Sequence, residues 1–183
     1  MFDSKKYWQD RYVNGGNSGS GSYNEFAKYK STVINNFVKQ FKIETVLELG
    51  CGDGNQLSHF DIPIYVGQDI SQKCVEQNKI RFPQYTFITS HDDIGGFDLT
   101  MSLDVVFHLI EDKVYKQYIY DLFNLSDRFV MIYAPNEDKV IAQHVKYRKF
   151  TDDIPLDFKL FKHIVNPLKG EYTQADFYIF ERI

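Results

Sequence analysis

The sequence has little cysteine and no long apolar run. Its 183 residues include only Cys51 and Cys74, too few for a disulfide framework or a cysteine-based metal site, so we expect no metal. No stretch reaches the roughly 18 apolar residues of a membrane span, and residues 1–6 open no apolar signal region. These absences favour a reduced, cytoplasmic protein that does not insert into a membrane.

Basic residues are not in excess either. The chain has 21 Lys and Arg against 25 Asp and Glu, a formal net charge of −4 and a pI near 5.7. We therefore expect no general affinity for nucleic acid or for an anionic membrane surface. What is present is typical of a globular protein, with 43% hydrophobic and 16% aromatic residues. The length suits a single domain over residues 1–183.

The most informative segment is 46–55, VLELGCGDGN. An apolar run is broken abruptly by Gly50, Gly52 and Gly54 at alternate positions. This pattern predicts a buried parallel strand and then a tight turn where backbone approaches a ligand closely. Asp69 ends the next apolar run, at about the 20-residue spacing by which an acid reaches ribose hydroxyls in a βαβ fold. The glycine loop and Asp69 together indicate a nucleoside-containing cofactor. The alternative is a glycine-rich turn that binds no ligand.

The loop lacks the features of two common nucleotide sites. A dinucleotide loop needs a glycine where Asn55 stands, and no Gly-Lys-Ser/Thr string is present, which excludes a P-loop. Carboxylates at Glu48 and Asp53 would repel a pyrophosphate but suit a ligand with an amine, a sulfonium and a ribose. A nicotinamide-dependent oxidoreductase is therefore disfavoured.

The string ELGCGDG at 48–54 resembles motif I of the class I S-adenosylmethionine-dependent methyltransferases, and 97–109 resembles the family's fourth strand, whose end faces the transferable methyl. The resemblance implies S-adenosyl-L-methionine as cofactor and the class I methyltransferase fold. That fold is α/β, with a seven-stranded, mostly parallel, doubly wound sheet and a C-terminal antiparallel hairpin. The alternation of strand-like and helix-like segments points independently to a doubly wound sheet.

The pattern predicts seven strands and, after a short amphipathic piece at 5–13, five helices. The strands are expected at 45–49, 64–68, 85–89, 97–102, 128–133, 159–165 and 176–181. The helices are expected at 24–41, 55–60, 71–81, 112–123 and 138–145. Residues 1–23 would form an N-terminal helix and a Gly/Ser-rich segment, and residues 24–183 the Rossmann-like core. We interpret the Gly/Ser-rich stretch 14–22 as a lid over the cofactor rather than an idle linker.

The resemblance implies a set of cofactor contacts. The residues assigned to them are Glu48, Gly50, Cys51, Gly52, Asp69, Ile70, Asp92, Asp93, Ser102 and Leu103. Glu48 would order the loop and the amino group, Asp69 would accept from both ribose hydroxyls, and Ile70 would pack against the adenine. Asp69 could instead only cap the next helix. Asp92 and Asp93 are alternatives for the adenine amine, or together a solvated turn.

Two residues after the fourth strand are candidates for catalysis. Asp104 stands just past the strand end, where open α/β sheets bind ligands, and His108 follows four residues later. If the stretch is helical, the two side chains share a face. We expect His108 to be the general base, with Asp104 orienting it or facing the methionine end. The alternative is that His108 is only a packing residue in an apolar run.

The acceptor site is predicted from a basic cluster and two tyrosines at the edges of the lid. The substrate-binding candidates are Tyr12, Tyr23, His144, Lys146 and Arg148, with Lys149 beside them. Such cations favour a carboxylate, phosphate or sugar-nucleotide acceptor, although a solvated helix end would look the same.

Segments 14–23, 102–112, 142–151 and 175–182 resemble small bacterial methyltransferases of surface-polysaccharide biosynthesis. That resemblance implies O-methylation of a sugar-related, phosphorylated or phosphoramidate precursor of a capsule. N-methylation of another small metabolite and a non-catalytic cofactor-binding partner subunit remain alternatives. A nucleic-acid methyltransferase is not expected, because no Asn/Asp-Pro-Pro-Tyr/Phe string follows the fourth strand and no basic tail is present.

Overall fold

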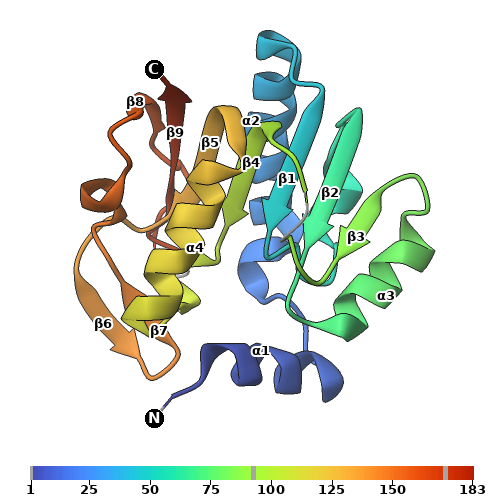
Figure 1. Ribbon diagram of the computed structural model, residues 1–183. Helices are drawn as coiled ribbons and strands as arrows, with labels where there is room; N and C mark the ends of the chain where they lie inside the picture. The colour runs from blue at the N-terminus through green and yellow to red at the C-terminus, as the bar shows by residue number, and fades with distance from the viewer. Residues whose placement is uncertain (1, 92–93, 171–172) are drawn as a thin grey trace.

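A seven-stranded sheet forms the centre of the molecule, in the order β3-β2-β1-β4-β5-β9-β8 (Figure 1). The computed structural model describes residues 2–91, 94–170 and 173–183. The strands are β1 Thr45–Leu49, β2 Ile64–Gln68, β3 Thr86–Ile88, β4 Phe97–Leu103, β5 Ser126–Ala134, β8 Phe158–Ile164 and β9 Asp176–Arg182. Neighbours from β3 to β5 are parallel, whereas β9 is antiparallel to both β5 and β8. The predicted fold class is confirmed.

The described residues form four α-helices, and three of these, α2 to α4, cover the two faces of the sheet. The helices are α1 Ser4–Val13, α2 Asn24–Phe41, α3 Gln72–Arg81 and α4 Asp112–Asn124, with short 3₁₀ turns η1 Ser20–Ser22, η2 Gln56–His59, η3 Val106–His108 and η4 Phe150–Asp153. Because side chains alternate along a strand, Val46 joins the core under α2 and α3, and Leu47 joins the core under α4. None of the helices in the described ranges combines the length and apolarity that a bilayer crossing needs.

α1 has a different position from the other helices. It lies across the ends of β1 and β2 rather than on a face of the sheet (Figure 1). The Gly/Ser-rich stretch and η1 then lead from α1 into α2. The N-terminal segment therefore covers the edge of the sheet at which the parallel strands end.

The helix predicted at 138–145 is wrong. The segment forms a separate antiparallel hairpin, β6 Lys139–Ala142 and β7 Val145–Tyr147. No residue from 139 to 147 is buried, so the segment has no apolar stripe with which a helix could pack on the sheet. Its β-branched Val140, Ile141 and Val145 favour extended backbone instead. The helix predicted at 55–60 is only the 3₁₀ turn η2.

Candidate functional site

A cavity of about 480 Å³ lies at the carboxyl ends of β1, β2 and β4, beneath α1. Its volume is within the range of small-molecule sites, and its place is where open α/β sheets bind ligands. The glycine loop after β1, the ends of β2 and β4, α1 and α4 all contribute to its lining. The sequence-predicted cofactor residues after β1, β2 and β4 therefore meet at one site.

Neighbouring side chains leave no room for a Cβ on Gly50 or Gly52, and backbone hydrogen bonds hold the glycine loop in place. Gly50 and Gly52 have φ angles of 82° and 56°, which favour glycine. A Cβ on Gly50 would lie 2.6 Å from Cγ2 of Val105, and a Cβ on Gly52 would collide with Oγ of Ser18. The amides of Gly50 and Cys51 both donate to the Gln68 carbonyl, at 2.7 and 3.0 Å. The loop is thus fixed against the end of β2 and against the N-terminal segment.

Asp69 connects this loop to the next helix. Its Oδ2 accepts from the Gly52 amide at 2.9 Å, and its Oδ1 accepts from the Ser71 amide at 2.8 Å. Burial raises the pKa of Asp69 to about 6. Because a carboxylate can accept about four hydrogen bonds, Asp69 retains capacity for ligand hydroxyls on the cavity wall.

Glu48 is a second buried carboxyl group in the cavity lining. The hydroxyl of Tyr65 donates to its Oε2 at 2.6 Å. Burial raises the pKa of Glu48 to about 7, while the Tyr65 hydrogen bond and the nearby Lys30 charge oppose that rise. A bound cation beside Glu48 would therefore lower this pKa and favour the ionised carboxylate at neutral pH.

Lys30 of α2 is a site residue that the sequence analysis missed. Its side chain is 0% exposed, and its Nζ lies 2.6 Å from Oδ2 of Asp104 and 5.2 Å from the centre of the Tyr133 ring. A signal was available, because Lys30 falls on the stripe of α2 that Ala27, Ile34 and others bury. A lysine at such a position is rarely buried unless it is paired.

The expected Asp104–His108 couple is not formed. Asp104 has a left-handed φ of 60°, and the next residues form the 3₁₀ turn η3 instead of an α-helix, so positions 104 and 108 do not share a helix face. The carboxylate of Asp104 pairs with Lys30, while Nδ1 of His108 lies 3.0 Å from the main-chain oxygen of His144. Both side chains nevertheless line the cavity.

The Gly/Ser-rich segment is docked on the glycine loop. Oδ2 of Asp53 accepts from the Ser18 amide at 2.9 Å and from the Tyr23 hydroxyl at 2.8 Å. The Asp53 amide donates to Oγ of Ser18, which also lies 3.0 Å from the Tyr12 hydroxyl. Tyr12 lines the cavity, whereas the Tyr23 side chain packs outside that lining. The segment thus has the position expected of a lid.

α1 is fastened at both of its ends. The Ser4 amide and hydroxyl donate to the two carboxylate oxygens of Glu111, at 2.8 and 2.5 Å. At the other end, Nζ of Lys73 donates to the Tyr12 carbonyl at 2.8 Å. Between them, Gln9 donates to the Ile70 carbonyl at 3.1 Å. The anchors are Glu111 at the start of α4, Lys73 in the first turn of α3 and Ile70 shortly after β2.

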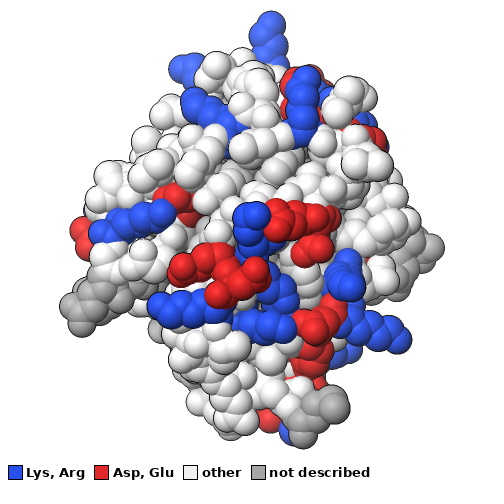
Figure 2. Space-filling view, turned by 90° about the vertical axis from the view of Figure 1, so that its left-hand side faces the viewer, with Lys and Arg blue, Asp and Glu red and all other residues white. Residues whose placement is uncertain are grey.

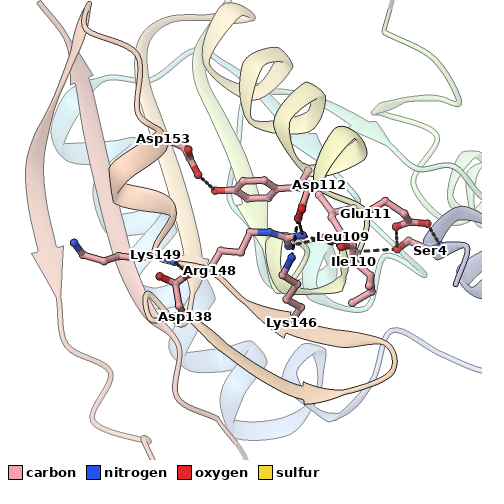
Figure 3. Close-up of polar contacts among 11 residues, drawn as sticks. Ser4, Leu109, Ile110, Glu111, Asp112, Asp138, Lys146, Arg148, Lys149 and Asp153 are labelled. Carbon is pink, nitrogen blue, oxygen red and sulfur yellow. Dashed lines mark hydrogen bonds and ion pairs between the residues drawn. The ribbon is translucent and has the colours of Figure 1, made fainter. Parts of the chain in front are cut away.

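The predicted basic cluster does not face an acceptor as a group. Figure 3 shows the Arg148 guanidinium between the start of α4 and the β6–β7 hairpin. It donates to the carbonyls of Leu109 and Ile110 at 2.6 and 2.8 Å and to Asp112 at 2.9 Å (Figure 3). Lys146 also pairs with Asp112, at 2.7 Å. Because its guanidinium N–H groups bind these carbonyls and Asp112, Arg148 is not proposed as an acceptor-binding residue.

The remaining predicted residues fall in three places. Leu103 lines the cavity, and Ser102 lies behind it, 2.8 Å from the Tyr118 hydroxyl. Asp92 and Asp93 lie outside the described residues. His91, the residue before them, lines the cavity with Nε2 3.2 Å from Asp121. In the described part of the chain, no group of three or more His, Cys, Asp or Glu side chains could hold a metal ion.

Comparisons with known proteins agree with this geometry. The sequence profile of the mRNA (guanine-N(7))-methyltransferase domain family matches residues 22–145. No curated protein sequence matches the chain.

Solved structures with the same fold include three methyltransferases. The magnesium protoporphyrin IX methyltransferase of Synechocystis PCC 6803 with bound SAM is 16% identical over 100% of this chain and 99% of its own, with a TM-score of 0.69. The N-methyltransferase NodS of Bradyrhizobium japonicum WM9 with S-adenosyl-L-homocysteine is 10% identical over 98% and 99%, with a TM-score of 0.78. The methyltransferase domain of bacterial CtHen1 is 14% identical over 87% and 99%, with a TM-score of 0.65.

Proposed function

The chain belongs to the family of the mRNA (guanine-N(7))-methyltransferase domain and is an S-adenosylmethionine-dependent methyltransferase, and we propose that its acceptor is a small polar molecule. This acceptor would be held in the cavity beneath α1. The observation that carries the proposal is the cavity itself. It joins the glycine loop, Asp69 and the end of β4 under a fastened N-terminal helix.

The chemistry of the cavity lining fits this cofactor. Asp69 would hold the ribose hydroxyls, because its carboxylate keeps free acceptor capacity beside the Gly52 amide. Glu48 would attract the ammonium group, and Lys30 would attract the carboxylate of the methionine part. The sulfonium supplies an activated methyl group, so this chain's task is to hold donor and acceptor close and aligned.

The size of the cavity and the distribution of surface charge support a small acceptor. Residues of α1 and of the 14–22 segment line the cavity, and its volume of about 480 Å³ suits a small molecule. Figure 2 shows Lys and Arg side chains interspersed with Asp and Glu on the face it presents, with no extended basic stripe. Binding of a polyanion to that face is therefore not favoured.

The narrower identification of the acceptor rests on sequence resemblance. We propose oxygen methylation of a sugar-related or phosphorylated precursor of a bacterial surface polysaccharide, carried out in the cytoplasm. His108 is the proposed general base for a hydroxyl acceptor, and Tyr12, which also lines the cavity, is proposed to border the acceptor. Amine methylation of another small metabolite is the alternative within the same site.

A second candidate acceptor is guanine in a free nucleotide. It is favoured by the family match, because members of that family are named for transfer to guanine N7. Guanine N7 is a neutral nucleophile without a proton to lose, so transfer to it needs no base. Turnover that survives loss of His108 would support this candidate over a hydroxyl acceptor.

The proposal is tested by titration calorimetry and by product formation. S-adenosylhomocysteine should bind the wild type, and Asp69→Asn should weaken binding by at least about 10-fold, since a hydrogen bond to a charged group contributes about 1.5–3 kcal/mol. Asp61→Asn, which changes an exposed carboxylate outside the cavity, is the matched control. No heat of binding for the folded wild type would overturn the proposal.

The acceptor is identified with labelled S-adenosylmethionine. Sugar nucleotides, phosphorylated sugars, amines and guanosine nucleotides are incubated with the enzyme, and products are read by mass spectrometry. Methylation of a small sugar-related compound supports the narrower proposal, and methylation of guanosine nucleotides alone would replace it. Binding of the cofactor without any methylated product favours the non-catalytic partner subunit.

A further inference from the structure

His108 is held by a backbone carbonyl from a segment far away in the sequence. Its Nδ1 lies 3.0 Å from the main-chain oxygen of His144, in the turn between β6 and β7. A carbonyl oxygen has no proton to give, so Nδ1 must carry the hydrogen of this bond. In a neutral imidazole the other nitrogen, Nε2, then carries no hydrogen, and its lone pair can accept a hydrogen bond.

Aromatic rings on several sides hold the imidazole in this orientation. Trp8 of α1 meets it edge-on with ring centres 4.8 Å apart, and the Phe107 ring lies at 4.5 Å. The His144 ring is parallel to it at 6.1 Å. Burial lowers the pKa of His108 to about 4, so the ring is neutral at physiological pH.

The charged and titratable groups around the ring do not change this state. The hydrogen bond to the His144 carbonyl and the charge of Asp104 favour the protonated ring, while the His144 side chain on the hairpin and Arg11 on α1 oppose protonation. The Asp104 carboxylate is itself paired with Lys30 at 2.6 Å. Over residues 2–91, 94–170 and 173–183, Nε2 of His108 has no hydrogen-bond partner, and the side chain lines the cavity.

We propose that Nε2 of His108, which carries no hydrogen because the neutral ring places its one N–H on Nδ1 against the His144 carbonyl, selects acceptors that carry an N–H or O–H at or beside the methylated atom. The inference rests on the proposed methyl transfer and narrows its acceptor. A lone pair attracts such donors and repels an anionic phosphate or phosphoramidate oxygen. Within the acceptor classes proposed above, hydroxyl and N–H compounds are therefore favoured over phosphate oxygens.

The assignment gives a balanced transfer to a hydroxyl. The acceptor oxygen forms the new C–O bond with its lone pair as the C–S bond breaks and returns its electrons to sulfur. The positive charge passes to the acceptor oxygen, whose proton moves to Nε2 and then to water. A base of low proton affinity is sufficient, because a methylated oxygen that still carries its proton is strongly acidic.

NMR spectroscopy can determine which nitrogen of His108 carries the hydrogen. Long-range ¹H–¹⁵N correlation spectra of the full chain with ¹⁵N-labelled histidine are recorded from acidic to neutral pH, with and without S-adenosylhomocysteine. His108→Gln or His108→Asn, whichever folds, identifies the His108 signals. We expect a protonated Nδ1 and an unprotonated Nε2 at every pH above the His108 pKa of about 4. His144→Ala keeps the carbonyl and is expected to keep this tautomer.

An Nε2–H tautomer or an imidazolium at neutral pH would overturn the inference. Acceptor selection is tested with hydroxyl compounds, N–H compounds and phosphate monoesters, each incubated with labelled S-adenosylmethionine. Every methylated atom should have carried, or neighboured, a hydrogen-bond donor, and methylation of a phosphate oxygen would contradict the selection. Absence of all turnover would count against the proposed function, while the spectra still decide the tautomer.

Discussion

Nζ of Lys30 lies 2.6 Å from Oδ2 of Asp104, and this ion pair joins the middle of α2 to the end of β4 at the cavity. The lysine side chain is 0% exposed, while the aspartate side chain is 17% exposed. The pair therefore connects a helix that covers the sheet with the strand end nearest the proposed acceptor.

Lys30→Met should destabilise the protein. The substitution leaves the Asp104 carboxylate without its partner in a largely buried place, which typically costs about 3–5 kcal/mol. Urea unfolding should show this loss, and the double variant Lys30→Met/Asp104→Asn should regain part of it. Lys146→Met, which removes one partner of the exposed Asp112 carboxylate, should change stability little. Equal stability of wild type and Lys30→Met would contradict the role of the pair.

Gly52→Ala should displace the Gly/Ser-rich segment. Its Cβ would collide with Oγ of Ser18 and lie 2.9 Å from the Tyr12 hydroxyl. Gly15→Ala is a matched control, because Gly15 also has a positive φ but nothing within 4 Å of an added Cβ. Both changes carry the left-handed strain of about 1–2 kcal/mol. Only Gly52→Ala should speed proteolysis within residues 14–22, and equal rates would argue against the docking.

The protonation of Glu48 should make stability fall as pH rises. Burial raises its pKa from 4.5 to about 7, so between these values the folded state binds more protons than the unfolded state. The stabilisation is complete below pH 4.5 and is lost as pH rises through about 7, by at most about 1.4 kcal/mol per pH unit.

The difference in unfolding free energy between wild type and Glu48→Gln isolates this effect from the other titrating groups. Urea unfolding at several pH values between 4.5 and about 7 gives that difference. The unfolding free energy of the wild type should fall relative to that of Glu48→Gln as pH rises. A difference that is independent of pH would show that Glu48 is already ionised in the folded protein.

Glu111→Gln should loosen the start of α1. The carboxylate accepts from both the amide and the hydroxyl of Ser4, and an amide side chain offers only one acceptor oxygen. Hydrogen exchange of the α1 amides should become faster, and S-adenosylhomocysteine should both bind and dissociate faster. Asp10→Asn, which breaks only the exposed pair with Lys6, is the control and should leave both rates unchanged.

The strands and the glycine loop could be predicted from the sequence because their signals are local. Buried strands are apolar runs, and the loop is marked by glycines at positions that require positive φ. Lys30 also has a local signal, a charge on a buried helical stripe. These features need no knowledge of which distant residues meet.

Other features depend on partners far along the chain. Arg148 looks like an anion-binding residue until its carbonyl partners at Leu109 and Ile110 are known. The segment 138–145 contains polar residues at helical spacing, but it has no buried face and its β-branched residues favour a hairpin. The bond between His108 and His144 spans 36 positions, so no local pattern predicts it.

Arg148 fastens the base of the β6–β7 hairpin, whereas the tip holds the carbonyl that faces His108. The tip can therefore vary in length and composition while the hairpin stays attached and the glycine loop is undisturbed. Relatives of this chain could diverge in what they methylate by exchanging a few residues there, with cofactor use inherited unchanged.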